Sequence, residues 1–242
     1  MNAIETIEKD GFTGKISQDE CPESSRDWGN LGTMACFHSR YNLGDEPYNS
    51  NKDDVIFELF VACLGDVSKA NSIVEKYESE YNSEDNRYRS KSDYCNERMF
   101  ETIEKQYIYL PLYLYDHSGI SINTSGFSCG WDSGQVGWIY VSKTEVKKEY
   151  KWKNLTKKRI EQIEGILKSE VETYDQYLKG EVYYITIENK EGEVIDSRGG
   201  YYGYDYALEE LNSMLNAEIK FHEQQEFTLF INRSAEIPAI KS

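Results

Sequence analysis

The sequence has no run of about 18 apolar residues, the minimum for a membrane-spanning helix. Its first residues, Met1 to Asp10, carry neither the basic nor the apolar part of a secretory signal. Cysteine is scarce and never occurs as a CxxC pair, which argues against a disulfide framework and a zinc knuckle. We therefore expect a cytoplasmic protein with reduced thiols. The five cysteines are Cys21, Cys36, Cys63, Cys95 and Cys129.

Histidine is also scarce, and the usual nucleotide and metal motifs are absent. His38, His117 and His222 show no HxH, HxxxH or HExxH spacing, so no zinc site follows from the pattern. Three carboxylates, Asp116, Asp132 and Asp196, could hold a divalent ion, although chance triplets are common among 43 acids. The chain has no Walker loop, no GxGxxG after a strand and no GxSxG elbow. We predict neither a bound metal nor a cofactor.

Positive charge is in deficit, with 27 Lys and Arg against 43 Asp and Glu, a net charge of −16. Nucleic-acid affinity comes largely from basic residues that neutralise phosphates, so we expect a partner with a basic surface and no direct binding of nucleic acid. One segment, 143–159, is locally basic. Its lysines are either a solvated face that pairs with acidic helices, or a docking patch in which Tyr150 and Trp152 stack on bases. The patch residues are Lys147, Lys148, Lys151, Lys157 and Lys158.

Aromatic residues make up 14% of the chain, which excludes a disordered protein. Apolar spacing predicts a helix from Asp53 and a long amphipathic helix over 160–178. The run YIYLPLYLY (107–115) predicts a buried strand with a bulge or edge position at Pro111. Together these patterns predict an α+β fold, a mixed sheet with a long amphipathic helix and several shorter ones. Further strands are expected at 31–37, 120–124, 136–142, 182–188, 193–196 and 226–231, and further helices at 67–81, 97–105 and 206–221.

For domain organisation we predict a polar N-terminal arm (1–25) and a single α+β domain (26–242) with a helical subregion (52–106). The glycine-rich segment GGYYG (199–203) precedes an expected helix. It is typical of a tight turn with packed tyrosines, or of an anion site at the start of that helix.

The loop FSCGWDSGQVG (127–137) places a thiol, a carboxylate, a hydroxyl and an amide among three glycines. With His117 at the end of the preceding strand, a catalytic arrangement of Cys129, His117 and Asp132 is one hypothesis, in which the histidine stabilises the thiolate and the carboxylate orients the ring. The alternative is structural. Cys129 and Trp131 would then be buried, while Asp132 and Ser133 would bond to loop amides.

Several segments together resemble a protein family encoded by bacteriophages, plasmids and other mobile elements of bacteria. They are SSRDWGNLGTM (24–34), RYNLGD (40–45), YLPLYLYDHSGI (109–120), FSCGWDSGQVGWIYVS (127–142), EVETYDQYLKGEVY (170–183) and DSRGGYYG (196–203). The sequence departs from the family pattern at Gly29, Gly130 and Gly199. The resemblance implies an accessory protein of an element that must survive host defences.

We therefore expect a non-enzymatic counter-defence protein, of the anti-restriction or anti-CRISPR kind, that inhibits a host defence or nucleic-acid-processing protein by mimicking nucleic acid. One alternative is a small enzyme or nucleotide-signal-binding protein that uses the DHSG and CGWDSG loops. Another is an RNA or DNA accessory factor that uses segment 143–159. The candidate binding residues are Trp28, Asn30, Asp116, His117, Ser118, Trp131, Asp132, Ser133 and Gln135.

Overall fold

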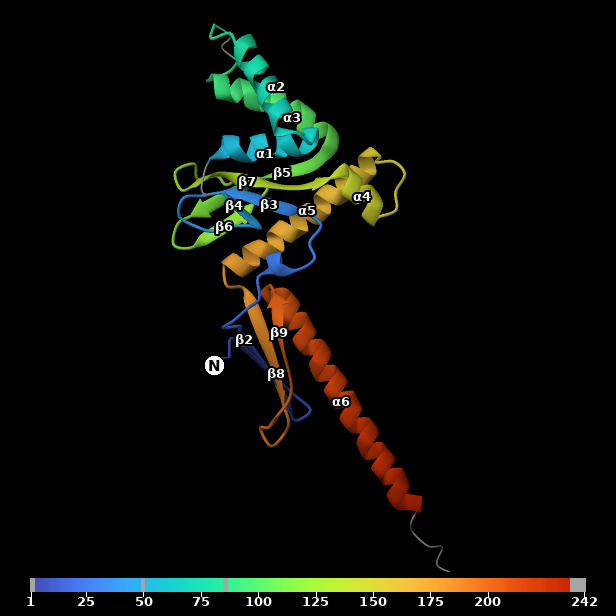
Figure 1. Ribbon diagram of the computed structural model, residues 1–242. Coiled ribbons are helices and arrows are strands. Elements are labelled where there is room, and N and C mark those ends of the chain that lie inside the picture. The colour runs from blue at the N-terminus through green and yellow to red at the C-terminus, as the bar shows by residue number, and fades with distance from the viewer. Residues whose placement is uncertain (1–2, 49–50, 85–86, 236–242) are drawn as a thin grey trace, which may run out of the picture. The chain divides into compact units, whose positions relative to one another are not determined.

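The computed structural model describes residues 3–48, 51–84 and 87–235 (Figure 1). The predicted α+β class is confirmed, because six helices accompany two largely antiparallel sheets in the described part of the chain. Residues 24–175 form one compact unit, and the two ends of the chain, up to Glu23 and from Gln176, form the other. The sequence had indicated a single domain over 26–242.

The unit over 24–175 is built on a five-stranded sheet in the order β4-β3-β7-β5-β6. The strands are β3 (Thr33–Phe37), β4 (Glu46–Tyr48), β5 (Tyr107–Asp116), β6 (Ile120–Asn123) and β7 (Ser133–Ser142). Only β3 and β4 are parallel, so the sheet is mixed. Pro111 pairs with Trp138 inside this sheet, and the expected bulge follows it as a register shift between Leu112 and Tyr113.

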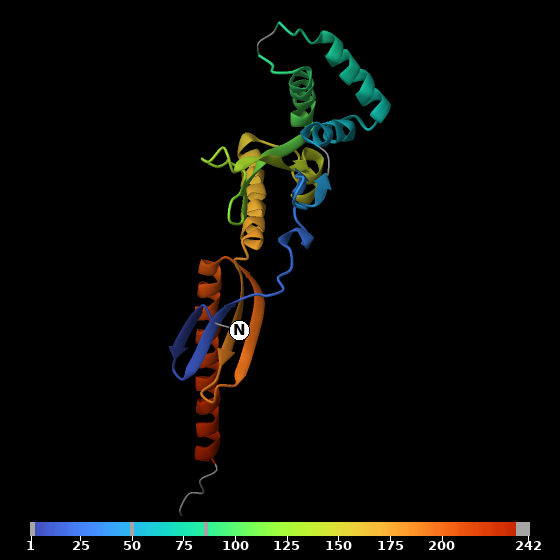
Figure 2. The ribbon, with the colours of Figure 1, turned by 90° about the vertical axis from the view of Figure 1, so that its left-hand side faces the viewer.

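Helices α1 (Lys52–Leu64) and α3 (Lys91–Gln106) lie on one face of this sheet, and α2 (Val67–Glu80) packs against these two helices (Figure 2). The side chain of Asn51 caps α1 and pairs reciprocally with Asp54, which satisfies amide groups that the first turn leaves unpaired. Gly65 ends α1 in the left-handed conformation (φ +68°). The core on this face joins the three helices to the sheet through residues such as Ile56, Phe60, Ile103 and Trp138.

Helix α5 (Lys157–Leu178) follows the short α4 (Lys143–Glu149) and confirms the predicted amphipathic helix. Its buried stripe, Ile163, Leu167, Val171 and Tyr174, steps by four, four and three residues. Because neighbouring strand residues point to opposite faces, Trp138 contacts the α1–α3 core while Ile139 lies beside Leu167, next to Gly32. Gly32 has no room for a side chain, since an added Cβ would lie 2.5 Å from Leu167 Cδ2.

The second unit is a four-stranded antiparallel sheet with one helix on its face. The order is β1-β2-β8-β9, from β1 (Glu5–Lys9), β2 (Phe12–Gln18), β8 (Val182–Glu188) and β9 (Val194–Tyr202). Helix α6 (Tyr204–Ala235) covers the face that carries Ile16, Ile185 and Ile187.

Three sequence predictions fail in this second unit. Residues 5–18 are not an arm but the hairpin β1–β2, which turns at Asp10 and Gly11 with positive φ at both (50° and 83°). Residues 226–231 are not a strand, because they continue α6. The prediction for 199–203 fails in part: Gly199 and Gly200 lie within β9 and not in a turn, but Tyr201 and Tyr202 are buried as expected, and Gly203 (φ +87°) directly precedes α6.

No helix in the described ranges is both long enough and apolar enough to cross a membrane.

Candidate functional site

The loop between β6 and β7, which we call the tryptophan loop (124–132), is anchored at both ends. At its start, Asn123 Oδ1 accepts the amide groups of Ser125 (3.1 Å) and Gly126 (2.7 Å). At its end, the Ser133 hydroxyl donates to the carbonyl of Cys129, and Asp116 N donates to the carbonyl of Asp132 (2.8 Å). These bonds give the loop a fixed shape without strand pairing.

The structure brings the three proposed catalytic residues together, but in a different order from the one expected. The Cys129 thiol donates to Asp132 Oδ2 (3.5 Å), and His117 Nδ1 lies 3.6 Å from that same oxygen. The carboxylate therefore lies between the thiol and the imidazole. A cysteine nucleophile needs an imidazole or a positive group beside its sulfur, and the group beside this sulfur is a negatively charged carboxylate.

Trp131 is 98% exposed, the highest value among the exposed large apolar residues of the described chain. The structural alternative from the sequence, which buried Trp131 as a core residue, is wrong on this point. Cys129 is half-buried. The ring of Trp131 is thus presented to solvent by a loop whose backbone is held in place. Exposing so large an apolar ring to water is unfavourable in free energy.

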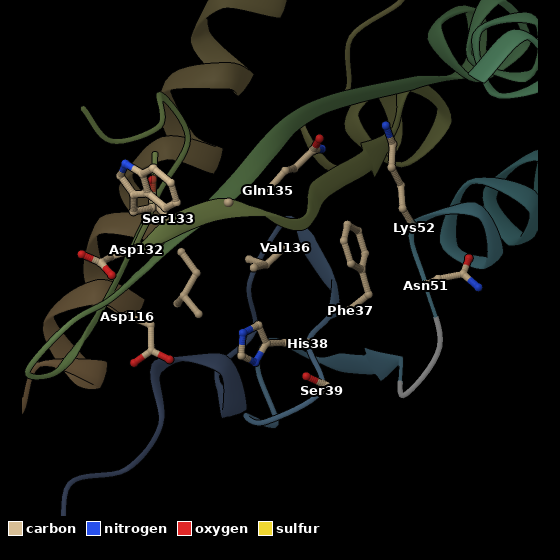
Figure 3. Close-up of a pocket in the computed structure, with 13 residues that line it drawn as sticks. Phe37, His38, Ser39, Asn51, Lys52, Asp116, Asp132, Ser133, Gln135 and Val136 are labelled. Atoms are coloured by element: carbon tan, nitrogen blue, oxygen red, sulfur yellow. The ribbon is translucent and has the colours of Figure 1, made fainter. Parts of the chain in front are cut away.

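An open pocket of about 600 Å³ lies beside the tryptophan loop, at the ends of β3, β5 and β7 (Figure 3). Asp116 and Asp132 lie on one side of it, and Lys52, from the start of α1, on the opposite side. The other lining residues are Phe37, His38, Ser39, Asn51, Leu114, Trp131, Ser133, Gly134, Gln135 and Val136.

Two lining side chains of this pocket are oriented by neighbours on one turn. Asp116 accepts hydrogen bonds from Arg40 Nη1 and from the Tyr41 hydroxyl, both at 3.0 Å. The hydrogen bond from the Tyr41 hydroxyl raises the pKa of Tyr41. His38 Nδ1 accepts the amide groups of Arg40 (3.2 Å) and Tyr41 (3.1 Å), so its Nε2 carries the ring proton. The pocket therefore contains a fixed acceptor, Asp116, and a fixed donor, His38.

The remaining predicted site residues are divided between this region and a second groove. Ser118 is exposed in the turn after β5, with φ +58°, next to His117. Trp28 and Asn30 line a separate groove of about 500 Å³ against α5, so the structure does not bring them to the tryptophan loop. Asn30 Nδ2 donates to the carbonyls of Ser25 (2.8 Å) and Trp28 (3.2 Å) and fixes that turn.

A buried ionic network beside this groove was missed by the sequence analysis. The Arg26 guanidinium, whose side chain is 5% exposed, forms two bonds to Asp45 (2.8 and 2.6 Å) and one to Glu170 (3.4 Å). Glu170 also accepts the amide groups of Leu31 and Gly32. Burial lowers the pKa of Arg26, but Asp45 and Glu170 outweigh it and raise the pKa overall. No local sequence pattern marks these charges, because each lies among other polar and charged residues.

The basic segment is exposed, but its aromatic residues are already occupied. Tyr150 and Trp152 stack on each other with centroids 4.7 Å apart, and the Arg159 guanidinium lies 4.7 Å from the Trp152 ring. Lys157 lies 4.0 Å from Glu161. Lys147, Lys148, Lys151, Lys157 and Lys158 are all exposed to solvent.

Metal binding has no geometric basis in the ranges that the structure describes, because no group of three His, Cys, Asp or Glu side chains could hold an ion there. Of the three carboxylates considered for a divalent ion, Asp116 and Asp132 lie in this unit. Asp196 belongs to the other unit, where it pairs with Arg198 (2.9 Å).

Comparison of the chain with protein-family models, with curated proteins and with solved structures gives no match.

Proposed function

We propose that the chain is a non-enzymatic binding protein that anchors a protein partner through Trp131. The partner we infer is a bacterial nucleic-acid-processing protein with a basic surface, which the chain inhibits by occupying that surface. The single observation that carries this proposal is the 98% exposure of Trp131 on an anchored loop.

Tryptophan on a fixed loop is well suited to be an interface anchor. Its large ring gains apolar burial on binding, and an anchored backbone loses little conformational freedom. Interface residues that contribute at least 2 kcal/mol are enriched in tryptophan and lie in the centre of contact. Trp131 has the exposure such an anchor needs before binding.

The charge of the chain supports a basic partner. Asp132, whose side chain is 39% exposed, adjoins Trp131 in the loop, and the whole chain carries −16. Such a field speeds encounter with a positive surface and repels free nucleic acid. Basic surfaces of this kind are typical of proteins that bind nucleic acid, and the resemblance to proteins of mobile elements suggests a host protein as the target.

A second candidate function rests on the pocket. Its volume of about 600 Å³ falls within the range of small-molecule sites, and His38, Lys52 and Gln135 supply polar groups with which to orient a ligand. Because Asp116 and Asp132 lie opposite Lys52, a nucleotide-sized signal molecule would bind with its phosphates toward Lys52 and the amino groups of its base toward the two carboxylates.

Affinity capture from a bacterial lysate followed by titration of the purified partner tests the first function. Trp131→Ala should weaken binding about 30-fold or more, the equivalent of an anchor contribution of about 2 kcal/mol. Val67→Ala is the matched control, because Val67 is 53% exposed in the same unit, on α2, and should change nothing.

Salt gives an independent readout of the same complex. Binding that depends on a basic partner should weaken steadily as salt rises, because exposed charges are screened over about 8 Å at physiological ionic strength. Equal binding by Trp131→Ala and wild type would reject the anchor. Loss of inhibition in His38→Ala, with unchanged affinity of that variant for the captured partner, would instead favour the pocket and a small ligand.

A further inference from the structure

The groove of about 500 Å³ lies between α5 and the chain at and after the short 3-10 helix η1 (Ser25–Asp27). It is distinct from the pocket beside the tryptophan loop, because the two share no lining residue in the described chain. Both views show the blue segment that holds η1 next to α5 (Figures 1 and 2). The groove is therefore a second candidate site within the unit over 24–175.

One side chain that lines this groove is buried with an unused hydroxyl group. Ser25 is 2% exposed, and its Oγ forms no hydrogen bond within the described part of the chain. A buried hydroxyl without a partner is unfavourable, and native structures contain few of them. Because Ser25 lines the groove, a molecule bound there can supply the missing partner.

The middle of α5 leaves open space above its backbone in the same groove. Gly165 is exposed in the interior of the helix, where glycine is less favourable than alanine. A Cβ added there would meet no atom within 4 Å, so packing within the described chain does not require glycine at this position. The missing side chain leaves room for a ligand to approach the helix closely.

The charges of the groove select a neutral ligand. Glu170 is the single charged residue among its described lining residues. Arg26 and the amide groups of Leu31 and Gly32 already bond to this carboxylate, which leaves little attraction for a cation. The Arg26 side chain is only 5% exposed, so it is too buried to bind an anion in the groove.

The other polar groups are hydroxyl and amide groups on both sides of the groove. Both amide hydrogens of Asn30 bond to backbone carbonyls, so its Oδ1 is left as an acceptor. The Thr173 hydroxyl donates to the Ser169 carbonyl (3.0 Å), so its oxygen also serves a ligand as an acceptor. Gln162 on α5 can both donate and accept. The ligand must therefore carry several donor groups that point in different directions.

We propose that this groove binds a neutral saccharide. Trp28, which is 44% exposed, supplies an apolar surface on which the C–H face of a sugar ring can stack. The hydroxyl groups around the ring then reach both sides of the groove, whose volume lies within the range of small-molecule sites. A nucleobase can stack equally well, but it has fewer donors for acceptors such as Asn30 Oδ1 and Thr173 Oγ1.

Saturation-transfer NMR, which detects weak binding, tests this proposal with the whole chain and unlabelled sugars. The probes are the neutral disaccharides maltose, cellobiose, lactose and N,N′-diacetylchitobiose, with adenosine and uridine as neutral nucleosides. At least one disaccharide should bind with a Kd of about 1 mM or tighter, and neither nucleoside should bind. Titration of that disaccharide then gives the affinity of each variant.

Three substitutions separate a binding role from a structural one. Trp28→Ala should weaken binding at least tenfold, because it removes the stacking surface. Ser25→Ala should weaken binding about fivefold without lowering the melting temperature, since the lost hydroxyl has no partner in the described chain. Gly165→Leu should fill the groove and abolish binding, and it should keep the fold because leucine favours a helix more than glycine does. Lys168→Gln is the control, because Lys168 is exposed on the same helix but does not line the groove.

Three results would overturn the proposal. They are no binding of any of the four disaccharides, wild-type affinity in folded Ser25→Ala or Gly165→Leu, and binding of the nucleosides without binding of a sugar. The measurement needs no partner protein, so its outcome is independent of the contact proposed for Trp131.

Discussion

Removal of the Arg26 charge should destabilise the unit over 24–175 far more than removal of any exposed arginine. Arg26→Met keeps most of the side-chain volume but removes four hydrogen bonds, two to Asp45, one to Glu170 and one to the Gly32 carbonyl (2.6 Å). Glu170 and Asp45 then keep their charge with side chains only 12% and 24% exposed. Breaking a buried pair in this way costs about 3–5 kcal/mol.

The lower end of that range applies here, because backbone amides still bond both acids. Leu31 and Gly32 donate to Glu170, and Met34 donates to Asp45 (2.7 Å). A loss of about 3 kcal/mol lowers the melting temperature of a unit of this size by about 6–12 °C.

Thermal unfolding followed by circular dichroism measures the effect, and Arg40→Met is the control. The Arg40 side chain is 70% exposed and pairs with Asp116, so its loss should cost at most about 1 kcal/mol. If the melting temperature of Arg26→Met falls by less than about 2 °C, the burial of Asp45 and Glu170 does not depend on the Arg26 charge, and the reasoning is refuted.

Two further predictions concern pH and the basic segment. Burial raises the pKa of Cys36 to about 12, so the native state holds its thiol protonated while the unfolded chain ionises above about 8.5. The free energy of unfolding should therefore fall by about 2 kcal/mol between pH 8 and 10, and urea titrations of Cys36→Ala should show a smaller fall. Replacing the five patch lysines with Gln should change stability by less than about 1 kcal/mol, because exposed charges contribute little. Fluorescence anisotropy should detect no binding of wild type to single-stranded DNA at physiological salt. Binding that is lost in the glutamine variant would show that the lysines contact phosphates, and it would favour an accessory factor. The lysines are Lys147, Lys148, Lys151, Lys157 and Lys158.

The fold was predictable where a single element carries its own pattern. The stripe of α5 and the apolar run of β5 are periodic over many residues, and both lie where the sequence placed them. The hairpin β1–β2 was predictable too, since Asp10-Gly11 between alternating residues is a strong hairpin signal, but the polar composition of the segment concealed it.

The strand predicted over 226–231 failed for a different reason. Phenylalanine, threonine and isoleucine favour strands in isolation. Here no glycine or proline separates Tyr204 from this segment, so a helix already formed on the sheet continues through it. Local propensity was outweighed by propagation from a packed helix.

The candidate site could be located from sequence but its arrangement could not. The cluster of Cys129, Asp132 and Ser133 indicated a polar loop, and that loop exists. Periodicity cannot say that Trp131 points to solvent, because average behaviour places tryptophan inside. The Arg26 network joins residues up to 144 positions apart, and only the fold brings those charges together.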